Sequence, residues 1–336
     1  MKAIVHDRYG PPEVLRLAEV EKPTVAADEV LVRVRATSVH ADVWHVVTGL
    51  PYVLRLMGSG LRRPQNPIPG TDLAGVVETV GSEVKAFQPG DEVFGESRHG
   101  MQWVNGGTYA EFVSVPADIL VLKPAEVTFE QAACVPTPGV IALSNLHGVG
   151  LPQPGDEVLV NGAGGGVGTI ALQLAKAYGA TVTAVDAPQK LEMLRNLGAD
   201  FVIDYTQQDF TQQDKRYDLI FDVASNLRLA DCKRVLTAKG KYLVIGHDHY
   251  GAKGRRVLGS LPQMIGMMAM ARFDPHLPSD NLPAPSKKEM MTTLSRFLAS
   301  GQITPLIDST YPLSDAPKAL RHLIEKPVMG RLILTL

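Results

Sequence analysis

The segment from Val158 to Gly168 constrains the fold of this chain more than any other, because a short apolar run passes directly into a glycine-rich turn and then into a helical pattern. Glycines let a turn adopt positive φ angles and bring backbone N–H groups close to a phosphate, and the following helix N-terminus attracts the same negative charge. The spacing Ala163-x-Gly165-x-x-Gly168 differs from the dinucleotide-binding fingerprint only in its first residue. The segment therefore predicts a dinucleotide phosphate site, although glycines also occur in plain loops.

The residues after this turn support the same interpretation. Apolar side chains recur at helical spacing, at Val167, Ile170, Ala171, Leu174, Ala175 and Tyr178. A β-branched run then ends on Asp186, about 20 residues after Gly165, where this fold places an acidic group on the adenosine ribose. Alternatively, Asp186 caps the next helix, with Pro188 in the first turn and Gln189 completing a capping box.

Charge and cysteine content argue against several classes of function. The 336 residues include 33 basic and 35 acidic side chains, so charge suggests no nucleic-acid or acidic-membrane partner. The two cysteines, Cys134 and Cys232, lie in apolar segments, which argues against a disulfide framework and favours a cytoplasmic protein. No apolar run reaches the roughly 18 residues of a membrane span, and we expect no signal segment at the start of the chain.

The pattern of elements divides the chain into three stretches. Short strands and turns alternate over residues 1–124, which indicates a β-rich domain. Over residues 125–286 strands alternate with helices, which predicts a parallel sheet whose ligand crevice lies at the carboxyl ends of its strands. We expect residues 287–336 to complete the first domain. In the middle stretch we expect strands at 158–160, 181–185, 201–203, 218–222 and 241–245, and helices near 167–178, 189–197 and 227–237.

Several short motifs occur in the order typical of one family. They are Met1-Lys2-Ala3-Ile4-Val5, Pro69-Gly70-Thr71-Asp72-Leu73-Ala74-Gly75, Pro89-Gly90-Asp91-Glu92-Val93, Leu197-Gly198-Ala199-Asp200 and Val202-Ile203-Asp204-Tyr205. Through them the chain resembles a medium-chain dehydrogenase/reductase, and within that superfamily the zinc-free quinone oxidoreductase and enoyl reductase branch. The resemblance implies an α/β fold with a GroES-like β-rich catalytic domain, residues 1–124 and 287–336, and a doubly wound Rossmann domain, residues 125–286. It also implies hydride transfer from a reduced nicotinamide in the cleft between them.

The resemblance allows metal chemistry to be examined directly. The zinc-dependent relatives need a Cys, a His-Glu pair and a later Cys or Asp, and the corresponding positions here hold His40, Thr71-Asp72 and Pro136-Thr137. Zinc prefers a tetrahedral set of thiolate and imidazole ligands, which one His and one Asp do not supply. A triad of His40, Asp42 and His45 is an alternative, but its spacing on a strand-to-helix turn gives no convergent geometry. We therefore expect no metal, and without one an already polarised acceptor is easier to reduce than an unactivated alcohol is to oxidise.

The segment around His40 and Asp42 occupies the position at which related reductases carry Asn-Pro-x-Asp/Glu beside the nicotinamide, with His40 in place of the asparagine. A histidine can donate a proton to a developing enolate or hydroquinone oxygen. Alternatively, His40 only hydrogen-bonds the backbone and shapes the pocket. Thr71, Asp72 and Thr137 match pocket-lining positions of the branch. Asp72 either fastens its turn through backbone amides or touches the substrate, and Thr137 either lies near the nicotinamide or caps a strand end.

The resemblance further implies which residues bind the cofactor. They are Gly162, Ala163, Gly164, Gly165, Gly166, Val167, Gly168, Asp186, Lys190, Tyr205, Val223, Ile245, Gly246 and Arg331. Asp186 should repel a 2′-phosphate, which slightly favours NADH over NADPH. Lys190 and Tyr205, however, match positions that flank the 2′-phosphate in NADPH-using relatives, so a single aspartate biases the choice without deciding it.

Two apolar runs, Val46–Arg63 and Val257–Phe273, are candidates for the substrate pocket. The second is rich in methionine, a flexible residue that suits a permissive pocket for flat hydrophobic acceptors. The alternative is that this run belongs to the core or to a subunit interface. Its end, Met270–Phe273, is also a candidate for a sixth sheet strand, which relatives use in dimer formation, and we expect a homodimer.

Three functions remain open at this point. The first is NAD(P)H-dependent, zinc-independent reduction of quinones or activated alkenes, which the complete cofactor site and the missing metal ligands favour. The second is a metal-free alcohol or aldehyde dehydrogenase with His40 as its base. The third is a dinucleotide-binding regulatory or structural protein without turnover.

Overall fold

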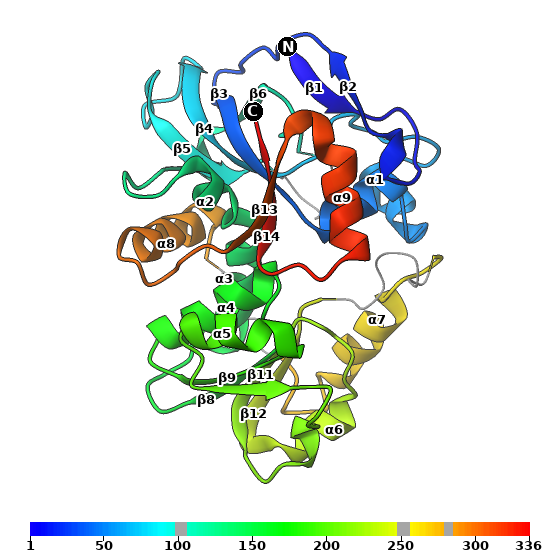
Figure 1. Cartoon of the computed structure of the whole chain (residues 1–336), viewed down its shortest axis with the longest axis vertical. Helices are drawn as coiled ribbons and strands as arrows, with labels where there is room; N and C mark the ends of the chain where they lie inside the picture. The colour runs from blue at the N-terminus through cyan, green and yellow to red at the C-terminus, as the bar shows by residue number, and fades with distance from the viewer. Residues whose placement is uncertain (98–105, 247–255, 279–284) are drawn as a thin grey trace.

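The computed structural model describes residues 1–97, 106–246, 256–278 and 285–336. The chain forms two lobes, one β-rich with elements from both ends of the chain and one built on a parallel sheet (Figure 1). Helix α3 (Pro136–Val149) lies at the junction between them. This architecture confirms the predicted fold class. None of the helices among the described residues is long and apolar enough to cross a bilayer.

In the described part of the chain, seven strands form the sheet of the β-rich lobe, in the order β13-β14-β3-β4-β5-β7, with β6 paired to β3. They are β3 (Glu29–Val39), β4 (Asp72–Val80), β5 (Glu92–Glu96), β6 (Phe112–Pro116), β7 (Leu120–Leu122), β13 (Ile307–Pro312) and β14 (Arg331–Thr335). Strands β1 (Lys2–Val5) and β2 (Arg16–Glu19) pair separately. Strand β14 runs antiparallel to β3, with Leu332 opposite Val39. The end of the chain therefore lies beside the strand that leads to His40.

The second lobe contains five parallel strands among the described residues, in the order β10-β9-β8-β11-β12. They are β8 (Glu157–Asn161), β9 (Thr181–Asp186), β10 (Phe201–Asp204), β11 (Tyr217–Asp222) and β12 (Leu236–Val244). The strand order reverses between β8 and β11, and in open parallel sheets ligands bind outside the carboxyl ends of the strands at such a point. The glycine-rich turn that follows β8 is located there.

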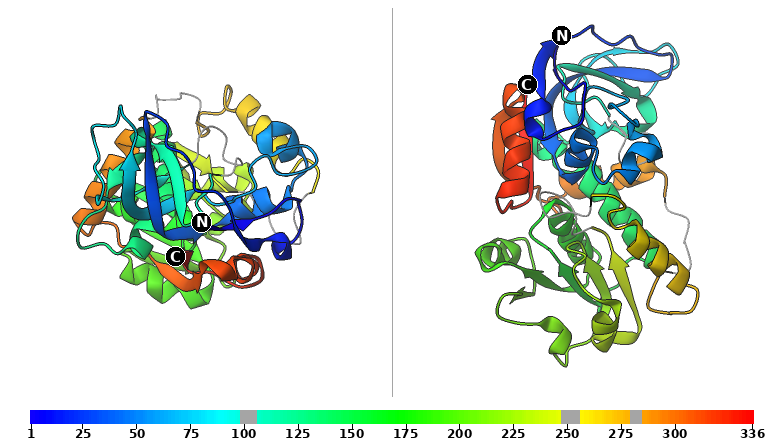
Figure 2. Two further views of the ribbon diagram at one scale, coloured as in Figure 1. Left: turned by 90° about the horizontal axis from the view of Figure 1, so that it is seen from above. Right: turned by 90° about the vertical axis from the view of Figure 1, so that its right-hand side faces the viewer.

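Helices cover the sheets and join the lobes. Helix α4 (Gly166–Ala177) packs against α3, and α3 also packs against α8 (Lys287–Ala299). The α3–α8 contact is close, because a Cβ atom on Gly139 would lie 2.6 Å from a methyl carbon of Leu294. The β-rich lobe carries α1 (Ala41–Thr48), α2 (Phe129–Ala133) and α9 (Ala316–Glu325), while α5 (Leu191–Asn196) and α6 (Leu229–Arg234) belong to the parallel sheet. Helix α7 (Leu261–Met270) lies where the lobes meet (Figure 2).

Three predicted elements differ from the structure. The helix expected at 189–197 is a 3-10 turn, Pro188–Lys190, followed by α5. The helix expected at 227–237 stops at Arg234, because Leu236 already pairs with Tyr217 and starts a longer β12. The sixth strand at 270–273 is wrong, since Met270 is the last residue of the apolar helix α7. Next to β12 the chain contributes a backbone hydrogen bond from Tyr242 N to His276 O (2.8 Å) instead.

Candidate active site

The glycine-rich turn connects the end of β8 at Asn161 to the start of α4 at Gly166. Gly162 has φ +78°, which favours glycine. A side chain at Gly168 has no room, because its Cβ atom would lie 2.2 Å from the carbonyl oxygen of Gly162. At Gly165, by contrast, a Cβ atom would meet nothing closer than 3.9 Å. The turn therefore presents the N-terminus of α4 to open space, which suits a pyrophosphate.

Strand β14 brings a cation to this turn. Gly330 N donates to Gly164 O at 3.0 Å, and Gly330 forms a parallel bridge with Gly165. The next residue, Arg331, is only 7% exposed, and a Cβ atom on Gly166 would lie 2.5 Å from its Nε atom. Within the part of the chain that the structure describes, this Nε has no hydrogen-bond partner. A buried guanidinium with an unused donor beside a helix N-terminus is suited to an anion.

Asp186 is the last residue of β9, and its carboxylate faces the glycine-rich turn. Its Oδ2 atom accepts a hydrogen bond from Gly164 N (2.7 Å), and its Oδ1 atom accepts one from Ala187 N (2.8 Å). Lys190 Nζ lies 3.5 Å from Oδ1. The predicted capping box of Asp186 and Gln189 is wrong, because the N-cap of the following 3-10 turn is Ala187 and no side chain caps it.

The other cofactor candidates gather at the same edge of the parallel sheet. Tyr205 follows β10, and its N–H donates to the carbonyl of Asp186 at 3.4 Å. Val223 follows β11, and Ile245 and Gly246 follow β12. The structure therefore brings these residues to the edge where the strand order reverses. Their contact with a cofactor stays a prediction.

A chain of side-chain contacts links three of the four catalytic candidates. His40 precedes α1, Thr71 precedes β4, and Thr137 lies in the first turn of α3. His40 Nε2 is 3.0 Å from Thr71 Oγ1, which is 3.3 Å from Thr137 Oγ1. All three residues are buried. Thr137 does not cap a strand, so that alternative is wrong. The fourth candidate, Asp42, lies in the first turn of α1 with Oδ2 3.8 Å from His40 Nδ1.

Asp72 lies fully buried behind this chain. Its Oδ1 atom accepts from Thr137 N (2.9 Å) and lies 2.6 Å from Thr137 Oγ1, and its Oδ2 atom accepts from Ser38 Oγ. Burial raises the pKa of Asp72, and the positive charge of Arg331 opposes that rise. Asp72 therefore fastens β4 to the start of α3, using one backbone amide of α3 rather than those of its own turn.

Two further charged residues, Glu96 and Lys287, belong to this cluster and were not predicted from the sequence. Glu96 ends β5 with no exposed surface, and its Oε1 atom lies 3.0 Å from Thr137 Oγ1. Its Oε2 atom lies 3.1 Å from Nζ of Lys287, the first residue of α8. An acidic residue ending the apolar run Val93–Gly95 was the available signal for Glu96. Lys287 had none, because only the packing of α8 brings it near β5.

Comparison with known proteins places this site in a family. Residues 26–125 match the alcohol dehydrogenase GroES-like domain, and residues 197–334 match the zinc-binding dehydrogenase family. The quinone oxidoreductase of Mus musculus is 30% identical in an alignment that covers 100% of this chain and 98% of that protein. The chain belongs to the quinone oxidoreductase-like branch of the medium-chain dehydrogenase/reductase superfamily.

Two further relatives agree with this assignment to the quinone oxidoreductase-like branch. The chloroplastic NADPH-dependent alkenal/one oxidoreductase of Arabidopsis thaliana is 29% identical, over 99% of this chain and 79% of that protein. The solved structure of the quinone oxidoreductase from Coxiella burnetii has a TM-score of 0.79 and 27% identity, covering 100% of this chain and 99% of that one. The predicted resemblance to quinone oxidoreductases is confirmed.

The donor set of this quinone oxidoreductase-like site does not fit a catalytic zinc ion. At the expected positions it offers one imidazole, two hydroxyl groups and the carboxyl group of Asp72, whereas zinc prefers a tetrahedral set of thiolates and imidazoles. Among the described residues, no three His, Cys, Asp or Glu side chains lie close enough together to hold a metal. Burial raises the pKa of both thiols, that of Cys232 to about 12 and that of Cys134 further, so neither supplies a thiolate. His45, the other imidazole of the alternative triad, bonds Leu50 O through Nδ1 (2.6 Å).

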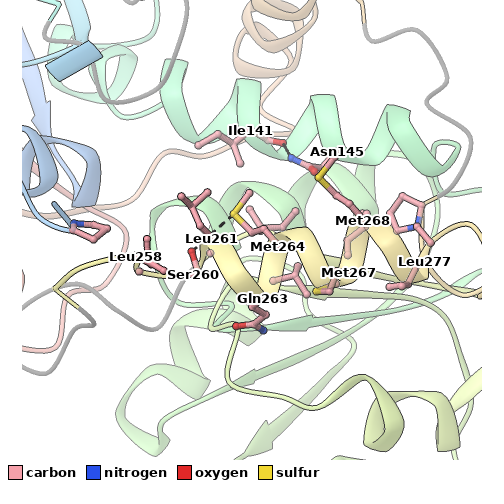
Figure 3. A pocket seen from close by; sticks show the side chains of 18 of the residues that line it. Ile141, Asn145, Leu258, Ser260, Leu261, Gln263, Met264, Met267, Met268 and Leu277 are labelled. Atoms are coloured by element: carbon pink, nitrogen blue, oxygen red, sulfur yellow. Dashed lines mark hydrogen bonds between the residues drawn. The ribbon is translucent and has the colours of Figure 1, made fainter. Parts of the chain in front are cut away.

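A cavity of about 570 Å³ lies between α3, the end of β12 and α7. Figure 3 shows Ile141 and Asn145 of α3 facing the methionine side chains of α7. Both apolar runs that the sequence singled out contribute to its lining, with Pro51, Val53 and Leu54 from the first and Leu258, Leu261, Met264, Met267 and Met268 from the second. Helix α7, described throughout, has no fully buried residue, and of its methionines Met267 packs, half-buried, against the core of the parallel-sheet lobe. Because Ile245 and Gly246 also line the cavity, it reaches the edge with the cofactor candidates.

Proposed function

We propose that this chain is an NAD(P)H-dependent oxidoreductase that transfers a hydride to a quinone or an α,β-unsaturated carbonyl compound without zinc. The buried contact chain from His40 through Thr71 to Thr137 carries the proposal. It supplies hydrogen-bond and proton donors at the positions where a zinc enzyme needs metal ligands. Relatives named for quinone and alkenal/one substrates support this acceptor class.

The residues around the glycine-rich turn fit a dinucleotide. Arg331 and the N-terminus of α4 would hold the pyrophosphate, and Asp186 would accept from the adenosine ribose. When bound, the reduced nicotinamide supplies a hydride to the acceptor. Asp186 repels a 2′-phosphate while Lys190, 3.5 Å away, attracts one, so we propose only a slight preference for NADH.

His40 would supply the proton. A quinone or enone oxygen becomes negatively charged as the hydride arrives, and a nearby donor stabilises that charge in the transition state. Thr71 holds the imidazole through Nε2 and so fixes its orientation. Because the carbonyl group of such acceptors is already conjugated and polarised, a proton donor suffices where an unactivated alcohol would need a Lewis acid.

The cavity under α7 would bind the acceptor. Its volume of about 570 Å³ lies within the usual range for small-molecule sites, and its lining is mostly apolar. Methionine side chains adapt to ligands of different shape, so several flat hydrophobic acceptors should bind.

The decisive assay compares two directions of reaction. Oxidation of NADH and NADPH is followed with 9,10-phenanthrenequinone, 1,2-naphthoquinone and an aliphatic enone, and reduction of NAD and NADP is followed with a panel of alcohols. We expect turnover in the first direction, undiminished after dialysis against a chelator. Faster alcohol oxidation would favour a dehydrogenase, cofactor binding without any turnover would favour a regulatory protein, and loss of activity with the chelator would contradict zinc independence.

We also propose that the chain forms a homodimer through α7 and the residues after it. Met264, Ile265 and Met268 are 48%, 64% and 73% exposed, and Phe273 is 89% exposed. Apolar side chains this exposed are usually covered by a partner. Sedimentation should give twice the chain mass for the wild type and a monomer for Phe273→Asp, and a monomeric wild type would contradict the proposal.

A further inference from the structure

The hydroxyl group of Thr137 lies within hydrogen-bond distance of two buried carboxyl groups at once. Thr137 Oγ1 is 2.6 Å from Asp72 Oδ1 and 3.0 Å from Glu96 Oε1. Asp72 and Glu96 both have no exposed surface, and Thr137 is 1% exposed. The three side chains come from β4, β5 and α3, so the contact is built by tertiary packing rather than by one loop.

One hydroxyl cannot satisfy two carboxylates. A threonine hydroxyl has a single hydrogen, and an ionised carboxyl group can only accept. If both Asp72 and Glu96 were ionised, one carboxylate oxygen would face a lone pair of Thr137 Oγ1, and a buried polar contact without a hydrogen is costly. A proton on one carboxyl group removes this conflict, because that group then donates to Thr137 while Thr137 donates to the other.

The neighbouring charges indicate which carboxyl group carries the proton. Lys287 Nζ lies 3.1 Å from Glu96 Oε2 and stabilises an ionised Glu96. Around Asp72, burial raises the pKa, Arg331 lowers it and the Glu96 charge raises it again. Among the described residues, the other titratable neighbours are His40, whose Nε2 lies 4.0 Å from Asp72 Oδ2, and Tyr109 and Cys134, whose own pKa values are raised by burial. Asp72 is therefore the protonated partner.

We propose that Asp72, Thr137 and Glu96 store one exchangeable proton, held on Asp72, which replaces the proton that His40 gives to the acceptor in each turnover. The proposal rests on the proposed reductase function. Its path runs from Asp72 Oδ1 to Thr137 Oγ1, Thr71 Oγ1 and His40 Nε2, with successive distances of 2.6, 3.3 and 3.0 Å. Asp72, Glu96 and Lys287 are positioning residues, since none of them is placed against the acceptor.

Protons and electrons balance along this path. The acceptor receives two electrons with the hydride and one proton from His40, and His40 regains a proton from the store. Lys287 then passes a proton to Glu96, and Glu96 returns a proton through Thr137 Oγ1 to Asp72, which refills the store. Lys287 takes its replacement proton from solvent, which its side chain reaches because it is 26% exposed. Each turnover therefore consumes one proton from solvent.

The stored proton can be observed without cofactor or substrate. Infrared spectroscopy of the ligand-free protein at neutral pH should show the carbonyl stretch of a protonated carboxylic acid. Asp72→Asn should remove this band, whereas the matched variant Asp222→Asn should keep it. Asp222 is equally buried and its pKa is likewise raised by burial, but hydrogen bonds from Tyr242, Asn161 and Ser225 stabilise its ionised form. If Asp72→Asn does not fold, carbon-13 labelling of aspartate in the wild type should shift the band. Absence of the band, or a band insensitive to aspartate labelling, overturns the proposal.

Turnover supplies a second test. Glu96→Gln should lower kcat about tenfold, less than loss of a direct proton donor would, with KM for the acceptor nearly unchanged and a larger solvent deuterium isotope effect on kcat. The control is Glu92→Gln on the same strand, where the carboxylate pairs with Lys123 at 2.9 Å outside the cluster and turnover should not change. A wild-type kcat and isotope effect in Glu96→Gln overturn the storage role. An infrared band in a protein without reductase activity contradicts the proposed function instead.

Discussion

The glycine-rich turn and the polar cluster around His40, Thr71 and Thr137 are built in opposite ways. The turn is one contiguous segment, Gly162–Gly168, that acts mainly through its backbone, with Asp186 from β9 and Gly330 and Arg331 from the C-terminal part of the chain in contact with it. The cluster acts through side chains, and its members come from five separate segments: Ser38 and His40, Thr71 and Asp72, Glu96, Thr137, and Lys287. The difference suggests that cofactor binding and proton delivery can be altered separately.

Within the cluster, replacement of His40 should have the largest effect on turnover. We expect His40→Ala to lower kcat about 100- to 10,000-fold, because the acceptor loses its proton donor. The dissociation constant of NADH, measured by fluorescence titration, should not change, since the turn stays intact. His147→Ala, in the last turn of α3, is the control and should keep wild-type turnover. An undiminished kcat in His40→Ala would leave His40 with a role in shaping the pocket only.

Acid should weaken the β-rich lobe before the parallel-sheet lobe. Burial lowers the pKa of His6, which follows β1, from 6.5 to about 4. Between these values the unfolded chain binds more protons than the folded one, so the free energy of unfolding falls as pH drops from 6.5 to 4, by roughly 3 kcal/mol. Denaturation at several pH values should show this slope in the wild type and a flatter one in His6→Gln. Equal slopes would contradict the prediction, and hydrogen exchange identifies the lobe that opens first.

Removal of the Arg331 charge beside the turn should weaken cofactor binding, and it should favour the protonated form of Asp72, since Arg331 lowers the pKa of that carboxyl group. Arg331→Met loses a charge-assisted contact to the pyrophosphate, so the dissociation constant of NADH should rise about ten- to hundredfold. Arg321→Met is the matched control, because Arg321 is exposed on α9 and pairs with Glu13. An unchanged affinity in Arg331→Met would mean that the unused Nε donor faces something other than the cofactor.

The smallest expected effect concerns the choice of cofactor. Asp186→Ser removes the charge that repels a 2′-phosphate and releases Lys190 to attract one, so the kcat/KM ratio of NADPH over NADH should rise about tenfold. Steady-state kinetics with both cofactors and one quinone measure this ratio. A ratio equal to that of the wild type would show that Asp186 only holds Gly164 and Ala187 in place.

Prediction from the sequence succeeded where one segment contains the whole signal. The turn at Gly162–Gly168 and the helix after it were predicted because backbone geometry and periodicity are local properties. Prediction failed where a contact with a residue distant in the sequence determines the local structure. The helix expected at 227–237 gave way to β12 because Leu236 pairs with Tyr217, and the capping box failed because Asp186 bonds Gly164 instead.

The candidate site shows the same division. His40, Thr71 and Thr137 were predicted because they match site positions of the quinone oxidoreductase and enoyl reductase branch. Their side chains, an imidazole and two hydroxyl groups, favoured proton donation over metal binding. Their mutual distances, however, depend on how β3, β4 and α3 pack. The sequence likewise named both apolar runs that line the cavity, while only the structure showed that they line the same one.

The sequence by itself determined the two-lobed α/β fold, the glycine-rich dinucleotide turn and the class of reaction, nicotinamide-dependent reduction. Glycine spacing, hydrophobic periodicity and residue type are local properties that can be identified in the sequence alone. Only the tertiary structure decided that Glu96 and Lys287 join Thr137 and Asp72 behind the pocket. The physical reason is that polar and charged side chains stabilise one another through short contacts between distant segments, and which segments meet depends on the packing of the whole chain.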